Sequence, residues 1–268
     1  MTLTNLVLLA IIQGLTEFLP ISSSGHLILL PNLLGFEDQG LALDVAVHVG
    51  SLVAVILYYR TDVARAARGT GQLLRGTVRD ADGFLALALL ISTLPVILGG
   101  LIFKLTGLVD ALRSVEVIGG TMLLFGLLLY YADTRKPETR HANGWRLKDA
   151  LIMGLWQILA LIPGTSRAGI TITGARFLGY RRQDAAKLAI LMSIPTILAS
   201  GALLGLDLIG SVTPDLLRDA AIAAAFAFVT AYGALALMIR LLSAVNFTPY
   251  VIYRVLLGLG LLGYAYLA

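Results

Sequence analysis

The sequence contains no cysteine among its 268 residues, which excludes disulfide bridges, thiolate catalysis and cysteine-ligated iron–sulfur clusters. Charge is also scarce: Asp, Glu, Lys and Arg make up 13% of the chain, against about 25% in soluble domains. This scarcity excludes an ordinary soluble enzyme, a disordered chain and a nucleic-acid-binding protein. The first apolar run lacks a basic leader and a small-residue cleavage site, so we expect no secretory signal peptide.

Apolar residues take the place of the missing charge and make up 58% of the chain. A helix needs about 20 predominantly apolar residues to cross a hydrocarbon core of roughly 30 Å. Six segments meet this requirement, some with one or two polar residues inside them: 41–59, 84–103, 115–132, 185–205, 220–239 and 249–267. These segments predict an all-α integral membrane protein with six transmembrane helices.

Two further apolar regions are interrupted in the middle and predict re-entrant helix pairs. Residues 3–19 lead to Pro20 and three serines, and a short apolar stretch, 27–34, follows. Residues 150–162 lead to Pro163 and the sequence GTSR, and a second short apolar stretch follows. A half-helix of about ten residues reaches ~15 Å, half of the hydrocarbon core, so each pair would enter and leave by the same face. The backbone at each break must then be buried in protein or line a polar cavity.

The interrupted regions divide the chain into two similar halves. At an offset of 143 residues the two prolines coincide and Ser23 falls on Ser166, while a Leu-Leu-Gly-Phe motif matches Phe-Leu-Gly-Tyr at an offset of 144. Each half, 1–140 and 144–268, then consists of one re-entrant pair and three spans. Three spans change the side of the membrane, so we expect an inverted-topology repeat within a single membrane domain. In such repeats, substrate sites lie near the midplane at broken helices.

Lysine and arginine are distributed unevenly between the two sides of this topology. Sixteen of them, Arg254 included, fall on the side opposite the N-terminus, and only Lys104, Arg113 and Arg218 fall on the N-terminal side. Cytoplasmic loops carry an excess of Lys and Arg. We therefore expect the basic side in the cytoplasm, both termini outside, and the first re-entrant pair entering from outside.

The first break contains a serine hydroxyl, an imidazole and a carboxylate within ten residues, in Ser23, His26 and Glu17. These are the parts of an activated nucleophile, and ionisable groups inside membrane segments are costly enough to indicate function. A helix N-terminus disfavours imidazolium, so we expect His26 to be neutral and able to accept a proton. Gln13 lies four residues before Glu17 on the same helix face.

The helix that follows the first break predicts an anion site. Ser22 or Ser23 can cap this helix, which leaves the backbone N–H groups of Ser24, Gly25 and His26 pointing into the break. Helix N-termini bind anions, and Gly25 lets the backbone approach a ligand closely.

The second break repeats this logic and adds a positive charge. Thr165 or Ser166 can cap the next helix, Arg167 offers a planar guanidinium that matches phosphate, and Thr171 follows on the same face. If the two breaks meet, their cavity should bind an anion, and phosphate fits best. Glu17 beside a phosphate would repel it unless a hard, oxygen-ligated cation such as Mg²⁺ or Ca²⁺ intervenes.

The motifs QGLTEFLPISSSGH at 13–26 and PGTSRAGIT at 163–171 resemble the two signature motifs of the bacterial undecaprenyl-diphosphate phosphatases, the bacitracin-resistance membrane family. The resemblance covers the whole chain. It implies a multi-pass protein of the bacterial inner membrane that removes the terminal phosphate of undecaprenyl diphosphate and recycles the lipid carrier for cell-wall synthesis. It also implies a divalent cation and an active site open to the outer face. The expected partners are a prenyl diphosphate lipid and the membrane, with no nucleic acid; a homodimer is an open alternative.

By position, the resemblance implies Ser23 as nucleophile, His26 as catalytic histidine, and Glu17 with Gln13 as the cation-binding motif. Glutamate is the other residue found at the position of Gln13, so its amide removes one carboxylate ligand; Ala168 stands where serine is common. Together with the anion site inferred above, the predicted phosphate-binding residues are Arg167, Ser166, Thr171, Ser24 and Gly25.

Three nucleophiles stay open at this point: Ser23 with His26 as its base or acid, His26 itself, or a metal-bound water. Two rival functions also stay open. Broken helices in an inverted repeat are transporter architecture, so a flippase for a prenyl phosphate would need a similar cavity. Asp44 and His48, four residues apart, either pair with each other or belong to a cation- or proton-coupled carrier. The Ser–His–Glu group favours the hydrolase, because binding alone does not require it.

Overall fold

The computed structural model describes residues 2–34, 40–206, 208 and 213–267, and no strand ladder occurs within them. Six helices are long and apolar enough to cross a membrane, which confirms the six predicted spans: α3 (Gly40–Tyr58), α5 (Ala81–Thr106), α7 (Val115–Arg135), α10 (Arg182–Leu206), α11 (Pro214–Leu241) and α12 (Thr248–Leu267). The other elements are shorter: α1 (Leu3–Glu17), α2 (Ser23–Leu34), α4 (Arg60–Leu73), α6 (Leu108–Ala111), η1 (Ala142–Gly144), α8 (Leu147–Ile158), η2 (Leu159–Leu161) and α9 (Arg167–Phe177).

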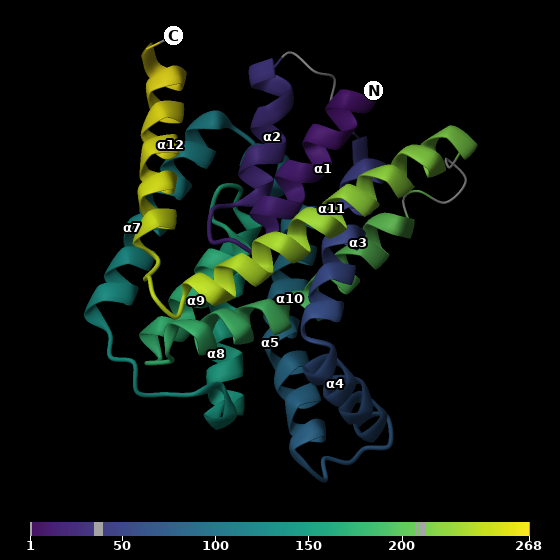
Figure 1. Ribbon diagram of the computed structural model, residues 1–268, viewed down its shortest axis with the longest axis vertical. Helices are drawn as coiled ribbons and strands as arrows, with labels where there is room; N and C mark the ends of the chain where they lie inside the picture. The colour runs from purple at the N-terminus through teal and green to yellow at the C-terminus, as the bar shows by residue number, and fades with distance from the viewer. Residues whose placement is uncertain (1, 35–39, 207, 209–212, 268) are drawn as a thin grey trace.

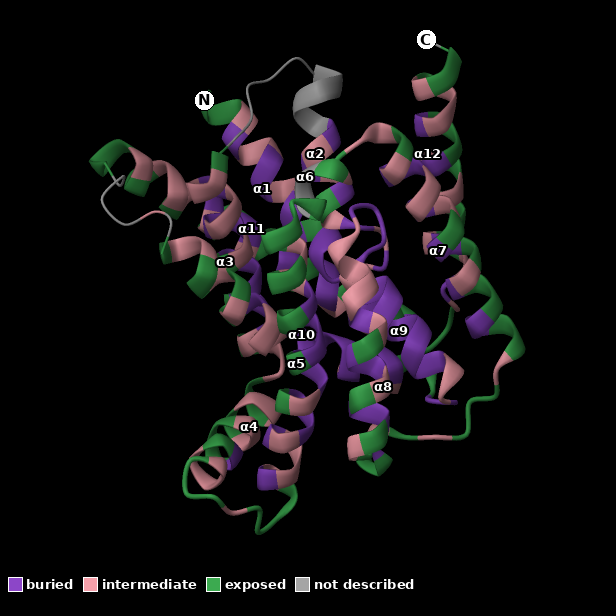
Figure 2. Cartoon of the chain, turned by 180° about the vertical axis from the view of Figure 1, so that it is seen from behind, coloured by how far each residue is buried: buried purple, intermediate pink, exposed green. Residues whose placement is uncertain are grey.

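The outward faces of the long helices are apolar. Leu98 on α5, Val229 on α11 and Leu256 on α12 are each more than half exposed. Figure 2 shows exposed and intermediate residues along these helices, while the buried residues gather in the middle of the molecule, above all in α9. Extended apolar faces of this kind belong in lipid rather than in water. The protein is therefore a multi-pass membrane protein.

Both termini lie at one end of the molecule, and α4 lies at the opposite end (Figure 1). The helices α1 and α2 both extend toward the end with the termini, and the turn that joins them lies in the middle of the molecule. The helix α8 begins at the other end (Figure 2). The two interrupted regions thus approach the centre from opposite ends, whereas their re-entry into a membrane and the inverted repeat stay predictions.

The helix α4 is an amphipathic element that the sequence analysis did not predict, because its charged residues carry no transmembrane signal. It packs against the first turns of α5, where Arg65 and Arg68 donate from Nε to the carboxylate of Asp82 at 2.8 and 2.9 Å. The close crossing of the two helices depends on Gly69. A Cβ at this position would lie 1.9 Å from the carbonyl oxygen of Asp82.

The two breaks share one capping geometry. Ser22 and Ser166 both have a left-handed backbone, with φ of 75° and 70°. The Oγ of Ser22 accepts from the N–H of Gly25 at 3.3 Å, and the Oγ of Ser166 accepts from the N–H of Gly169 at 3.0 Å. These equivalent positions are 144 residues apart. The offset of 143 that aligns the two prolines is therefore wrong by one residue for the caps. Ser22, not Ser23, is equivalent to Ser166, because the second break has one more residue between its proline and its cap.

Arg254 of α12 is fully buried and holds both breaks. Its guanidinium donates to the carbonyl of Pro20 in the first break at 3.4 Å, and to those of Gly164 and Thr165 in the second break at 3.2 and 2.9 Å. Further bonds reach carbonyls of α7. The expectation that Arg254 belongs to the basic end of the molecule is therefore wrong. The side chain instead occupies the interior, where the turns leave carbonyl groups without helical partners.

Two glycine substitutions on α4 test the close crossing with α5. Gly69→Ala should lower the free energy of unfolding by about 1–3 kcal/mol, because the added methyl group meets backbone that cannot move away. Gly71→Ala is the matched control, since a Cβ at Gly71 meets nothing within 4 Å. Its better helix propensity should leave stability unchanged or raise it by up to ~1 kcal/mol. Thermal unfolding in detergent measures both variants, and equal melting temperatures would contradict the crossing.

Candidate active site

The two breaks meet in the interior of the molecule. A Cβ at Gly25 would lie 3.6 Å from the Cα of Gly164, so the start of α2 packs directly on the second break. Thr121 of α7 donates from Oγ1 to the carbonyl of Pro163 at 2.6 Å and fixes that break from the other side. A Cβ at Gly25 would also lie 3.3 Å from the side chains of Ile118 and Ser22, so the space at this position is limited mainly by α7 and by the cap.

A polar cavity of about 160 Å³ lies at this junction. Its lining comes from both interrupted regions and from two of the spanning helices, α3 and α10. The lining residues are Glu17, Ser23, Ser24, His48, Ala160, Ser166, Arg167, Thr196, Ile197 and Ser200. Side chains far apart in the sequence thus converge on a space large enough for a phosphate group.

The carboxylate of Glu17 connects the two halves of this cavity. Its Oε1 accepts from Nη2 of Arg167 at 2.5 Å, and its Oε2 accepts from Ser23 Oγ and from Gln13 Nε2, both at 2.8 Å. The Nε2 atom of His48 lies 3.7 Å from the same Oε2. Glu17 is 7% exposed, so this charge is buried together with its partners. Buried carboxylates persist only when they are paired and hydrogen-bonded in this way.

Arg167 has one half of its guanidinium available. While Nη2 pairs with Glu17, the Nη1 atom is buried and makes no hydrogen bond to any residue that the structure describes. Arg167 is also the first residue of α9, whose N-terminus attracts negative charge. An unpartnered buried donor at a helix N-terminus is a site for an anion, and the planar guanidinium matches phosphate.

Comparison with known proteins agrees with this chemistry. The family described as bacitracin resistance protein BacA matches residues 6–260. This protein belongs to the BacA family. It is 66% identical to the undecaprenyl-diphosphatase of Roseobacter denitrificans and 65% identical to that of Dinoroseobacter shibae, over 99% of this chain and all of each relative. The undecaprenyl-diphosphatase of Hahella chejuensis is 47% identical over the full length of both chains.

Five of the predicted site residues of this BacA-family protein line the cavity: Glu17, Ser23, Ser24, Ser166 and Arg167. Gln13 lies behind Glu17 and contacts it. Three others, His26, Gly25 and Thr171, do not line it. Thr171 is buried and donates from Oγ1 to the carbonyls of Arg167 and Ala168 at 2.7 and 3.1 Å. Its contacts stabilise the first turn of α9, so any effect on phosphate would act through Arg167.

The ring of His26 turns away from Ser23 and toward α12. Its Nδ1 donates to the carbonyl of Ser22 at 2.6 Å, which leaves Nε2 to accept from the hydroxyl of Tyr253 at 2.5 Å. The two rings are also stacked, with centroids 5.7 Å apart. The structure therefore brings Ser23 together with Glu17 rather than with His26, and the catalytic role of His26 stays a prediction.

Three polar residues of the spanning helices also reach the site, and among them only His48 was a candidate in the sequence analysis. His48 enters from α3, and Thr196 and Ser200 enter from α10. The Nδ1 of His48 donates to the backbone carbonyl of Asp44 at 2.7 Å, so its Nε2 faces Glu17. Polar residues inside the predicted spans could have indicated these positions. The hydropathy of a span, however, does not show which side of the helix faces the breaks.

The donor set next to Glu17 can hold a hard cation. The Nε2 of Gln13 donates to Glu17, while its Oε1 is buried and accepts no hydrogen bond from the described residues. An amide oxygen and a carboxylate are ligands that Mg²⁺ and Ca²⁺ accept. The described residues contain no cluster of three His, Cys, Asp or Glu side chains with metal-site geometry. These two side chains have the oxygen chemistry for such a cation, but Gln13 does not line the cavity, and the cation stays a prediction.

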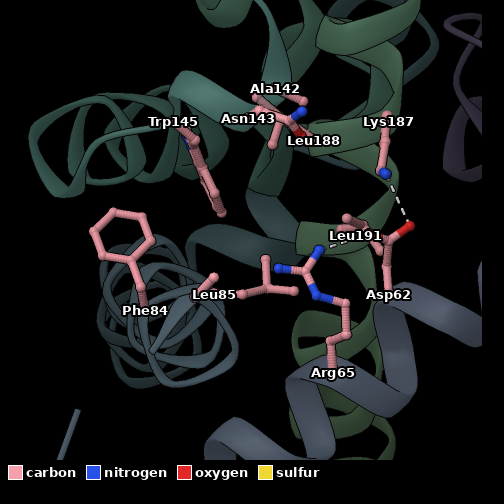
Figure 3. A pocket seen from close by; sticks show the side chains of 11 residues that line it. Asp62, Arg65, Phe84, Leu85, Ala142, Asn143, Trp145, Lys187, Leu188 and Leu191 are labelled. Atoms are coloured by element: carbon pink, nitrogen blue, oxygen red, sulfur yellow. Dashed lines mark ion pairs between the residues drawn. The ribbon is translucent and has the colours of Figure 1, made fainter. Parts of the chain in front are cut away.

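A second polar pocket lies beside α4 and has a different character (Figure 3). It has a volume of about 390 Å³ and is lined by residues of α4, α5, α10 and the η1 region. Lys187 pairs with Asp62 at 2.8 Å, and Arg65 pairs with Asp82 at 2.8 Å. Its cations are therefore matched by carboxylates, in contrast to the half-free guanidinium of Arg167.

Binding of inorganic phosphate tests the competition between Glu17 and an anion for Arg167. With chelator present, Glu17→Gln should bind phosphate about tenfold more tightly than the unsubstituted protein, because the competing negative charge is gone. Arg167→Met should abolish binding, and Arg240→Met, at an exposed position on α11, should leave it unchanged. Isothermal titration calorimetry in detergent gives the dissociation constants. Weaker binding by Glu17→Gln in chelator would contradict this account of the cavity.

Proposed function

We propose that this protein is an undecaprenyl-diphosphatase that hydrolyses undecaprenyl diphosphate to undecaprenyl phosphate and inorganic phosphate. Such an activity would recycle the lipid carrier for cell-wall synthesis and give resistance to bacitracin. The observation that carries the proposal is the buried Ser23–Glu17–Arg167 chain with a free guanidinium donor at its end. It is supported by curated relatives of that name at up to 66% identity over the full chain.

The hydrogen bond from Ser23 to Glu17 provides the path by which the nucleophile loses its proton. As Ser23 Oγ attacks the terminal phosphorus in line, its proton passes to Glu17 Oε2 and a phosphoserine forms. The bond between this phosphorus and the bridging oxygen breaks, and undecaprenyl phosphate leaves. Glu17 then returns this proton to Ser23 Oγ as water attacks the phosphoserine and the bond between phosphorus and Oγ breaks. The proton lost by the attacking water passes through the freed carboxylate to the solvent, and inorganic phosphate departs. Positioning and charge stabilisation dominate phosphoryl transfer of this kind.

Arg167 and the N-terminus of α9 stabilise the charge on the transferring group. Nη1 of Arg167 donates to a non-bridging oxygen, and the first backbone N–H groups of α9 face the same charge. Engagement of phosphate by Arg167 weakens its pairing with Glu17, which makes that carboxylate a better base for Ser23. The ion pair therefore links substrate binding to activation of the nucleophile.

A divalent cation, Mg²⁺ or Ca²⁺, belongs to this proposal. Glu17 and the Oε1 of Gln13 would hold it. When bound, the cation supplies positive charge that neutralises the phosphate oxygens of the substrate. Because Gln13 replaces a carboxylate at this position, the protein contributes few charged ligands, and binding should be tighter with substrate present than without it.

The location within the cell envelope is also a proposal. The relatives are bacterial, and the apolar spans place this protein in a membrane, which we take to be the inner one. The helix α4 lies at the end opposite the termini (Figure 1), and residues 60–80, which cover α4 and the loop after it, contain Arg60, Arg65, Arg68, Arg75 and Arg79. The positive-inside rule then puts this end in the cytoplasm and both termini on the periplasmic side, where the cavity would open. A homodimer stays a prediction, and light scattering of the purified protein measures it.

The hydrolase is favoured over a flippase by one contact. A carrier needs the anion site but gains nothing from a serine hydroxyl that donates to a buried carboxylate, whereas a nucleophile does. The carrier based on Asp44 and His48 has less support, because the imidazole of His48 donates to the backbone of Asp44 and faces the cavity.

Phosphate release from undecaprenyl diphosphate by the purified protein tests the activity. Chelator should abolish release, and Arg167→Ala should lower kcat/KM by about 10³-fold, a loss of ~4 kcal/mol of transition-state stabilisation. Ser23→Ala should lower kcat by at least the same factor. Arg240→Ala is the control at an exposed arginine. No release by the folded protein would reject the function, and substantial release by Ser23→Ala would replace the phosphoserine by direct attack of water.

A further inference from the structure

A groove between α3 and α10 adjoins the active-site cavity. It has a volume of about 390 Å³ and lies between two helices that pack side by side (Figure 1). Three residues, His48, Ile197 and Ser200, line both the groove and the cavity. The other lining residues are Leu41, Asp44, Val45, Val49, Leu52, Leu198, Gly201, Ala202 and Leu204. The two spaces are therefore adjacent, and these three side chains form the wall between them.

The lining of the groove is partly polar and partly apolar. It includes the polar side chains of His48 and Ser200, which also line the cavity, and elsewhere it is aliphatic except for the carboxylate of Asp44. At its rim Val49 is 44% exposed and Leu198 is 54% exposed. Both helices are of membrane-spanning length and composition, so this rim faces the bilayer interior. A ligand that lies across the junction needs a charged head and an apolar chain.

Two larger apolar grooves do not adjoin the cavity in this way. One, of about 640 Å³, lies between α5 and α8, and the other, of about 580 Å³, lies among α4, α5 and α10. Neither shares a lining residue with the active-site cavity. A chain attached to a phosphate in the cavity would leave through the α3/α10 groove rather than through either of these.

We propose that the α3/α10 groove binds the first isoprene units of the prenyl chain while the diphosphate occupies the cavity. This proposal rests on the proposed function and names the subsite that its substrate would use. Lipid tails are as apolar as the groove, so transfer of the chain from the bilayer provides little driving force. The groove acts by orientation: it fixes the direction of the prenyl chain and so aligns the bridging oxygen opposite the Ser23 nucleophile.

Gly201 provides a direct test, because a Cβ at this position meets nothing within 4 Å. Gly201→Leu therefore fills the groove without forcing the backbone to move. Gly233→Leu is the matched control: a Cβ there also meets nothing within 4 Å, and the residue lies on the exposed side of α11. Phosphate release is measured with prenyl diphosphates of fifty-five and five carbons, since the short substrate keeps the head group but lacks the chain beyond the first unit.

For the fifty-five-carbon substrate, Gly201→Leu should lower kcat/KM at least tenfold. For the five-carbon substrate it should stay within twofold of the unsubstituted protein, and Gly233→Leu should stay within twofold for both. Unchanged hydrolysis of the long substrate by Gly201→Leu would overturn the groove proposal. Equal losses for both chain lengths would also overturn it, because a groove for the chain spares the short substrate.

Photo-crosslinking reads the same groove without turnover. A prenyl diphosphate with a diazirine in its second isoprene unit should label residues 40–58 and 182–206, and Gly201→Leu should remove most of this label. Labelling of α5 and α8 instead would overturn the proposal. A diazirine phospholipid is the control. If it labels α3 and α10 equally well, and excess prenyl diphosphate does not reduce that labelling, the proposal is also overturned. If the unsubstituted protein releases no phosphate yet gives the expected label, the proposed function fails and the groove stands.

Discussion

The hydrogen bonds of one buried guanidinium are the constraint on which the structure depends. Each break leaves buried backbone carbonyls without helical partners, and such groups need hydrogen-bond donors from the protein. Arg254, supplied by α12, donates to carbonyls of both breaks and of α7. Because one planar group serves both turns, the breaks cannot separate without leaving these donors and acceptors unpaired. Residues about 140 positions apart in the sequence are thereby brought to a common cavity.

The breaks that Arg254 joins form the candidate site, in which the same carboxylate contacts both the proposed nucleophile and the proposed anion-binding arginine. The ion pair between Glu17 and Arg167 crosses from one break to the other, and Ser23 donates to the same carboxylate. Glu17 pairs with Nη2 of Arg167, and the buried Nη1, which has no partner among the described residues, is the donor that the proposal assigns to phosphate. The left-handed caps at Ser22 and Ser166 orient the two helix starts toward the junction. The α3/α10 groove then gives an apolar chain its way out of the site.

Much of this arrangement follows from the sequence, and the remainder has a clear physical reason. Apolar runs predicted the six spans, and the prolines with their Ser and Thr neighbours predicted both breaks. That the breaks meet was only a condition of the sequence argument, and the contact of Glu17 with Arg167 supplies it. The cap register was missed because proline marks the end of one helix rather than the start of the next. The pairing of His26 with Tyr253 and the burial of Arg254 depend on contacts across more than 200 residues. Local patterns carry no information about such partners.

Amide hydrogen exchange of Arg254→Lys tests the central claim most directly, because this variant keeps the charge but loses the planar set of donors. Peptides that cover residues 18–26 and 162–170 would be compared with those of the unsubstituted protein in detergent. Exchange should accelerate at least tenfold in both break segments together, while residues 220–239 of α11 stay unchanged. Acceleration in only one break, or in neither, would contradict the view that Arg254 holds the two breaks as a unit.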